Sequence, residues 1–193
     1  MNQPRILAFA GSTRQDSFNK KLIQIAAAGA RKAGAEVTVI DLRDFPLPVF
    51  DQDLEAREFP ENAKKLKSLF LAHQGLLLSC PEYNSSMTPV LKNTIDWVSR
   101  PLPGEKSLAC FAGKTAGLVS ASPGALGGLR GLVHVRAVLG NIQVLVVPDQ
   151  MAVSAAQEAF QADGSLKDAK KQEAVENVGA QVAKLLIKLQ AAV

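Results

Sequence analysis

The chain has 193 residues, of which 47% are hydrophobic and 21% charged, so it can bury one full core and has an ordinary globular composition. Its net charge of +4 comes from scattered basic residues without a long lysine and arginine run, so we expect no nucleic-acid partner. No apolar stretch reaches the length of a membrane span and the first five residues show no signal peptide, so we expect a cytoplasmic protein without membrane contact.

The predicted elements alternate between strands and helices. Residues 6–10 form a short apolar strand, and a polar loop, 11–19, follows it. A helix begins near Ser17 and ends at Gly34, because apolar residues recur three and four positions apart between them. The next segments are a second strand (36–40), a long proline-containing loop (42–60), a helix (61–73) and a third strand (75–80).

The alternation continues through the second half of the chain. A polar loop, 81–87, follows the third strand, and Thr88 can cap a helix over 88–100. Pro89 suits the first position of that helix, where a missing N–H breaks no helical hydrogen bond. The remaining segments are a long connection (101–114), a fourth strand (115–120), a helix (124–138), a fifth strand (142–147) and a final helix with apolar residues from Val175 to Leu189.

Strands that alternate with helices predict an α/β protein with a parallel sheet covered on both faces. Five strands fit a flavodoxin-like α/β/α sandwich with strand order 2-1-3-4-5, and we expect residues 1–193 to form one such domain. In this order the first, third and fourth strands are neighbours. The loops that follow them then meet at the carboxyl edge of the sheet, where ligands bind in open α/β folds.

The first of these loops has the composition of a phosphate site. It carries hydroxyls at Ser12, Thr13 and Ser17, a guanidinium at Arg14 and an amide at Asn19, all at or just before a helix start. A helix N-terminus offers free N–H groups and a favourable dipole to an anion. The residues alone also allow a simpler interpretation, in which Ser17 only caps the helix and Arg14 lies in solvent.

The second loop offers groups that suit a flat heterocycle. The amide of Asn84 and nearby backbone N–H groups can bind a ring edge, and Tyr83 can stack on or cover the ring. A plain turn with an exposed Tyr83 is the alternative.

The third loop resembles the nucleophile turn of hydrolases, but Pro123 after Ser122 has no N–H for an oxyanion hole. We therefore expect a tight turn followed by Gly127 and Gly128, where bare backbone can approach a ligand. Arg130 can bind a ligand, pair with a carboxylate at a subunit contact, or lie on the surface.

The remaining reactive side chains do not form a recognisable site. Cys80 and Cys110 make no disulfide framework or metal cluster, and Cys80 is expected to pack at a strand end. His73 and His134 lie on predicted helices without partners at metal spacing. We therefore predict neither a catalytic side chain nor a bound metal.

The motifs resemble those of the NAD(P)H-dependent FMN reductase family, which includes flavin-dependent quinone, azo-dye and chromate reductases. The resemblance covers roughly residues 5–150, including a segment after the second strand that begins at Asp41. The motifs are Gly11–Ser12, Arg14, Ser17 and Asn19; Pro81–Glu82–Tyr83–Asn84, Leu91–Lys92–Asn93 and Ile95–Asp96–Trp97; and Ser120–Ala121–Ser122–Pro123–Gly124, Gly127–Gly128 and Arg130.

This resemblance implies a flavodoxin-like fold, non-covalent FMN, and hydride transfer from NADPH or NADH through FMN to a quinone, azo compound, flavin or similar small molecule. It implies a phosphate site in the first loop and a flavin ring flanked by the other two. It also implies a homodimer or homotetramer. The expected cofactor-binding residues are Ser12, Arg14, Ser17, Phe18, Asn19, Pro81, Glu82, Tyr83, Asn84, Ser120, Ser122, Pro123 and Gly124.

Two segments depart from the family pattern. Many relatives carry an aromatic residue and a Pro-Gly pair where this chain has residues 85–89, and the connection 101–114 is several residues longer than usual. The alternative function is an electron carrier or nucleotide-binding module without its own NAD(P)H turnover, although flavodoxin-type carriers are usually acidic and this chain has a pI of about 9.1. We expect subunit contacts at apolar residues of the two long loops, namely Phe45, Leu47, Val49, Phe50, Leu102, Leu108 and Phe111.

Overall fold

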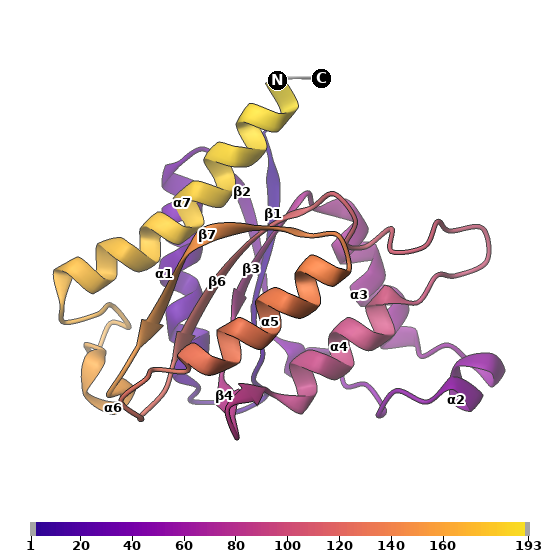
Figure 1. The fold of residues 1–193 in the computed structure, drawn as a ribbon, viewed down its shortest axis with the longest axis horizontal. Helices are drawn as coiled ribbons and strands as arrows, with labels where there is room; N and C mark the ends of the chain where they lie inside the picture. Colours follow the sequence, from indigo (N-terminus) through magenta and orange to yellow (C-terminus); the bar gives the residue numbers. More distant parts are fainter. Residues whose placement is uncertain (1–2, 192–193) are drawn as a thin grey trace.

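A computed structural model describes residues 3–191 and shows a parallel five-stranded sheet with helices on both faces (Figure 1). The strand order is β2-β1-β3-β6-β7, which is the predicted flavodoxin-like order. The two strands that come between β3 and β6 in the sequence, β4 and β5, form a small separate hairpin. The strands of the main sheet are β1 (Arg5–Ala10), β2 (Glu36–Ile40), β3 (Gly75–Ser79), β6 (Thr115–Ala121) and β7 (Leu145–Val153), and those of the hairpin are β4 (Glu82–Tyr83) and β5 (Ser86–Met87).

The helices divide between the two faces of the sheet (Figure 1). One face is covered by α1 (Phe18–Lys32) and α7 (Ala169–Ala191). The other is covered by α3 (Glu61–Ala72), α4 (Pro89–Ser99) and α5 (Leu129–Asn141). Shorter helices are η1 (Leu42–Asp44), α2 (Gln52–Arg57) and α6 (Ala156–Ala159). Within residues 3–191, none of the helices has the length and apolar character that crossing a bilayer requires.

Two glycines let α1 and α7 approach each other closely. A Cβ at Gly29 of α1 would lie 1.9 Å from the carbonyl oxygen of Glu176, and one at Gly179 of α7 would lie 1.9 Å from that of Ala26. Any side chain at either position would push the helices apart. The close packing fixes α1 on the sheet, and with it the loop that precedes α1.

Two predicted boundaries were wrong. The expected helix over 124–138 is α5, which begins only at Leu129 because Gly127 and Gly128 have positive φ and keep the chain in a turn. The expected fifth strand over 142–147 is β7, which runs to Val153. Its pairing with β6 has an irregularity after Val146, and the ladder resumes at Gln150. Pro148 falls in this interruption on an edge strand, where its missing N–H breaks no ladder bond.

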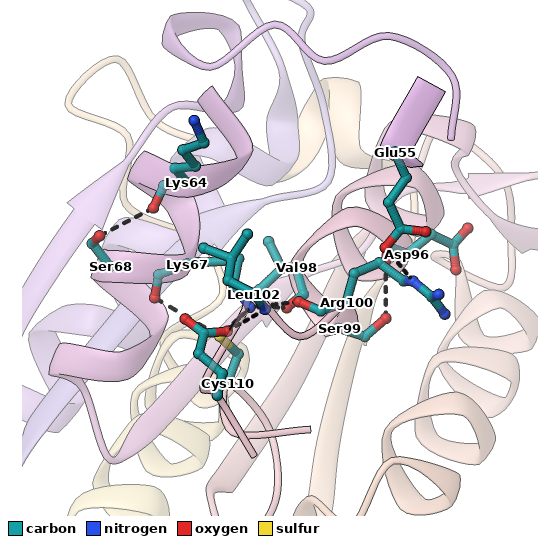
Figure 2. A network of polar contacts seen from close by, with 11 residues as sticks. Glu55, Lys64, Lys67, Ser68, Asp96, Val98, Ser99, Arg100, Leu102 and Cys110 are labelled. Carbon is teal, nitrogen blue, oxygen red and sulfur yellow. Dashed lines mark hydrogen bonds and ion pairs between the residues drawn. The ribbon is translucent and has the colours of Figure 1, made fainter. Parts of the chain in front are cut away.

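The long connection between α4 and β6 is held by one buried lysine, Lys67 of α3 (Figure 2). Its side chain is 3% exposed, and its Nζ lies 2.8 Å from a carboxylate oxygen of Glu105. The same ammonium donates to the carbonyl of Arg100 at 2.6 Å and approaches Sγ of Cys110 at 3.6 Å. The connection is therefore anchored at three places by a single charge.

Candidate functional site

The three loops after β1, β3 and β6 meet at the carboxyl edge of the sheet and enclose a pocket of about 180 Å³, called here the edge pocket. Ten of the thirteen predicted site residues line it, together with Ala121. Asn84, Ser120 and Gly124 are not part of the lining. The lining residues are Ser12, Arg14, Ser17, Phe18, Asn19, Pro81, Glu82, Tyr83, Ala121, Ser122 and Pro123.

The first loop presents hydrogen-bond donors to one end of the edge pocket. Ser17 is the N-cap of α1 and is 4% exposed, but its side chain makes no capping hydrogen bond. The first turn of a helix also leaves backbone N–H groups without helical partners. The guanidinium of Arg14 lies over the ring of Phe18, 5.3 Å from its centroid, and donates to the carbonyl of Asp16. Hydroxyl, backbone N–H and guanidinium donors are therefore gathered at one helix start.

Asn19 has a different position from the one expected of a phosphate ligand. It is 4% exposed, and its Nδ2 donates to the carbonyl of Ala121 at 2.8 Å. Its Oδ1 accepts from the backbone N–H of Ala121 at 3.0 Å and from the Ser79 hydroxyl at 2.9 Å. The Asn19 amide thus joins α1 to the ends of β3 and β6, and it holds the first and third loops at a fixed separation.

The second loop, which the sequence predicted only as a polar loop or a turn, is a β-hairpin. Glu82 pairs with Met87 and Tyr83 with Ser86, which leaves Asn84 and Ser85 as a two-residue turn. Both turn residues have positive φ, 49° and 66°, as a type I′ turn requires. The turn carries Asn84 outside the edge pocket lining, while Tyr83 lines the pocket and is 58% exposed.

The carboxylate of Glu82 fastens this hairpin to the start of α5. Its Oε1 accepts from Nε and Nη2 of Arg130 at 3.0 and 2.7 Å, and its Oε2 accepts from the backbone N–H of Gly131 at 3.0 Å. Desolvation raises the pKa of Glu82, but these hydrogen bonds and the charge of Arg130 outweigh it and hold the pKa below its usual value. Arg130 therefore pairs with a carboxylate of its own chain.

In the third loop, packing within the protein accounts for Ser120, Gly127 and Gly128, which the sequence had suggested as ligand contacts. Ser120 is fully buried, and its hydroxyl donates to the carbonyl of Gly127 at 2.7 Å. A Cβ at Gly127 would lie 2.7 Å from the carbonyl carbon of Val153, and one at Gly128 would lie 2.9 Å from the Ser120 hydroxyl oxygen. These glycines pack against the protein itself, and Ser122 with Pro123 forms the pocket wall.

The edge pocket has no acid or base with the features of a catalytic group. Its titratable lining residues are Arg14, Glu82 and Tyr83, and Glu82 is committed to Arg130. Cys80 is buried at the end of β3, and burial raises the pKa of its thiol, so it stays protonated. Neither histidine lines the edge pocket, and residues 3–191 hold no cluster of three or more His, Cys, Asp or Glu side chains suited to a metal.

Two contacts that position the site were missed from sequence. The hydroxyl of Thr88, the predicted N-cap of α4, also donates to the carbonyl of Gly11 at 2.7 Å. A Cβ at Gly11 would lie 3.0 Å from Cβ of Leu91, so the first loop lies directly against α4. Ala121 lines the pocket but was not among the expected cofactor-binding residues, because an alanine carries no chemical signal in the sequence.

The fold, a donor-rich helix start and a pocket at the carboxyl edge of the sheet are those of a flavodoxin-like nucleotide-binding protein. The sequence model of a family described as NADPH-dependent FMN reductase matches residues 4–158. The chain is 37% identical over 174 residues to an NAD(P)H-dependent FMN reductase from Pseudomonas aeruginosa, a match that covers 89% of each chain. It is 32% identical over 163 residues to a 2-hydroxy-1,4-benzoquinone reductase from a Burkholderia species, covering 84% of this chain and 85% of the other.

A solved structure agrees with these relatives. The flavoenzyme NAD(P)H:(acceptor) oxidoreductase FerB from Paracoccus denitrificans superposes with a TM-score of 0.81 at 26% identity, over 96% of this chain and 98% of that one. This chain belongs to the NADPH-dependent FMN reductase family. It is an oxidoreductase that uses FMN as cofactor and NAD(P)H as hydride donor, as the sequence motifs had predicted.

Proposed function

We propose that FMN binds in the edge pocket with its phosphate at the first loop and its ring between the second and third loops. The observation that supports this most directly is the Ser17 hydroxyl, which stands at the N-cap of α1 without making a capping bond and so remains available to a ligand. Ser12 and Arg14 line the same end of the pocket. Asn19, Ser120 and Glu82 act by positioning the loops, because their polar atoms are already bonded within the protein.

The side chains that line the pocket indicate which part of the reaction the cofactor performs and which part the protein performs. Bound FMN supplies the redox chemistry, accepting a hydride and delivering two electrons to an acceptor. The first loop would bind and orient the phosphate, and Pro81 and Ser122, which line the pocket, would border the ring. None of the lining side chains is required to hold or move a proton.

A comparison of two flavins tests the phosphate placement. Ser17→Ala and Arg14→Ala should each weaken FMN about tenfold or more in titration calorimetry, since a charge-assisted hydrogen bond contributes about 1.5–3 kcal/mol. Riboflavin, which has no phosphate, should lose little affinity in the same variants. Thr13→Ala is the matched control, because Thr13 is in the same loop but does not line the pocket. Equal losses for both flavins would show that the loop does not hold the phosphate.

A quinone is the acceptor class that we propose. The edge pocket encloses only about 180 Å³, less than the roughly 300–1,000 Å³ of most small-molecule sites, so a flavin ring held there leaves a side open to a flat acceptor. The relative from the Burkholderia species is named for a benzoquinone. Steady-state oxidation of NADPH with benzoquinone tests this, and its absence in FMN-loaded protein would favour the electron-carrier alternative.

We also propose that two or more copies assemble around the open side of the edge pocket. Large apolar side chains are exposed beside it on the hairpin and around the start of α5, namely Tyr83, Leu126, Leu129 and Val133. Of the long-loop residues expected at a subunit contact, Phe111 is fully buried and Phe45 and Leu47 pack on the core. Val49 is 84% exposed, so the long loops offer one large exposed apolar side chain rather than the extended surface that the sequence suggested. Light scattering at micromolar concentration tests this proposal, and a monomer would contradict it.

The location that we propose is the cytoplasm. Cys80 and Cys110 are both free thiols, which suits a reducing compartment. Fractionation of the native cell would test this, and recovery outside the cytoplasm would contradict it.

A further inference from the structure

A second hollow, of about 500 Å³, lies beside the first loop, between α1 and the turn 162–165 that precedes α7. Ser17 lines both this hollow and the edge pocket. We call the hollow the α1 groove. Its volume falls within the usual range for small-molecule sites, and neither the phosphate nor the ring of FMN accounts for it.

The polar groups of the α1 groove lie along one face of α1. Ser17, Lys21, Gln24 and Ala28 follow one another at spacings of three or four residues and span roughly 16 Å at about 1.5 Å per residue. Within residues 3–191, Lys21 has no carboxylate at ion-pair distance, and its Nζ lies 5.9 Å from the centroid of the Phe160 ring. The amide of Gln24 has no hydrogen-bond partner in the same part of the chain.

We propose that the α1 groove takes the adenylate half of FAD, so that the protein binds FAD as well as FMN. This rests on the proposed placement of the FMN phosphate at the first loop. In FAD a second phosphate and adenosine continue from that phosphate, and Ser17 marks the point where the two cavities adjoin. Lys21 stands one turn along α1 to meet the second phosphate. Gln24 is one turn further, and an amide is the side chain that matches the paired donor and acceptor of adenine.

The carboxylates of the groove favour an adenosine with free ribose hydroxyls. Asp16 and Asp163 both line it, and Oδ1 of Asp163 is already held by the hydroxyl and backbone N–H of Ser165. Carboxylates accept hydrogen bonds from ribose hydroxyls, as in dinucleotide-binding sites. They disfavour each added negative charge, so the groove suits the one further phosphate of FAD, which Lys21 offsets, better than the adenosine end of NADPH with its additional 2′-phosphate.

Calorimetric titration of the apoprotein with FMN, FAD and riboflavin tests the assignment. We expect FAD to bind at least as tightly as FMN. Lys21→Ala should weaken FAD about tenfold while FMN stays within about twofold, and Gln24→Ala should act in the same direction. Lys65→Ala is the matched control, an exposed lysine of α3 on the opposite face of the sheet.

The outcomes separate this inference from the proposed function. If FMN binds and FAD does not, the groove assignment is wrong while the FMN site stands. If FAD binds but Lys21→Ala and Gln24→Ala leave its affinity unchanged, its adenylate lies elsewhere and the assignment is also wrong. A loss of NADPH affinity in Lys21→Ala without a loss of FAD affinity would assign the groove to the hydride donor instead. Failure of FMN itself to bind would overturn the proposed function.

Discussion

The side-chain amide of Asn19 makes two hydrogen bonds to the backbone of one residue, Ala121, which lies 102 positions away in the sequence. One bond uses Nδ2 as donor and the other uses Oδ1 as acceptor, so the Asn19 amide satisfies both the backbone C=O and the backbone N–H of Ala121. The contact joins the first and third loops across β3. The width of the edge pocket at this point is therefore set by one side chain.

Replacement of Asn19 should reduce both stability and flavin affinity. Asn19→Ala leaves the buried N–H and C=O of Ala121 without partners, which should cost about 2–3 kcal/mol in the free energy of unfolding measured with urea. Asn19→Asp keeps the acceptor but buries a charge and sets a carboxylate oxygen against the Ala121 carbonyl, so it should also destabilise the protein. An unchanged unfolding midpoint in Asn19→Ala would show that this contact does not hold the loops.

Replacement of Lys67 should destabilise the protein without emptying the flavin site. Lys67→Met removes a cation with a 3% exposed side chain and leaves Glu105 unpaired, so we expect a loss of about 3 kcal/mol. FMN affinity should change little, because no residue of the network drawn in Figure 2 lines the edge pocket. Lys64→Met, which breaks an exposed pair with Glu61 on the same helix, is the control and should cost under about 1 kcal/mol.

A second substitution separates charge from packing in this network. Glu105→Gln in the Lys67→Met background removes the unpaired carboxylate and should restore part of the lost stability. If the double variant is no more stable than Lys67→Met, then lost packing and the lost hydrogen bond to the Arg100 carbonyl, rather than the unpaired carboxylate, explain the effect.

Stability should depend on pH through Glu82. Its pKa is lower in the folded protein than its ordinary value of 4.5, so its pairing with Arg130 stabilises the fold above that pH. The stabilisation is lost as pH falls through the folded-state pKa. Wild type should therefore be more stable than Glu82→Gln at pH 7, and the difference should shrink below about pH 4.5 in urea titrations. A difference that stays constant between pH 7 and pH 3 would contradict this.

Replacement of Cys80 should leave turnover nearly intact. Burial raises the pKa of its thiol, and no thiolate is available for nucleophilic or redox chemistry. We expect Cys80→Ser and Cys80→Ala to keep NADPH–quinone turnover within about tenfold, or roughly 1.4 kcal/mol in the barrier, when rates are normalised to bound flavin. Complete loss of activity with full flavin content would indicate a thiol-dependent mechanism.

Sequence patterns predicted the strand order because short buried strands have continuous apolar runs and the helices between them have clear periodicity. They also predicted the N-cap role of Thr88, whose side chain accepts from the N–H of Leu91. They placed the end of β7 too early, because a proline within an apolar run resembles a strand end. In the structure the pairing of β7 with β6 is irregular around Pro148 and resumes beyond it. Pairing irregularities depend on the neighbouring strand and have no local signal.

For the site, residue type predicted which residues gather at the sheet edge but not what each side chain does there. Ser12, Arg14 and Ser17 line the edge pocket as expected, whereas the polar atoms of Asn19 and Ser120 are taken up by contacts within the protein. The hairpin at Asn84 was also missed, because Ser85 has positive φ where glycine usually stands. Such assignments require knowledge of which distant backbone each side chain meets.

The close packing of α1 on α7 also determines when, during synthesis, α1 can reach its final position on the sheet. The carbonyl oxygens of Ala26 and Glu176 occupy the space that side chains at Gly179 and Gly29 would need, so α1 gains its final support only from the last helix of the chain. A chain synthesised only as far as β7 lacks that support, and part of the apolar surface of the sheet stays uncovered until α7 has been made. Cofactor loading is therefore expected only after α7 has been made, and the apoprotein without a packed α7 is the form most exposed to chaperones and proteases.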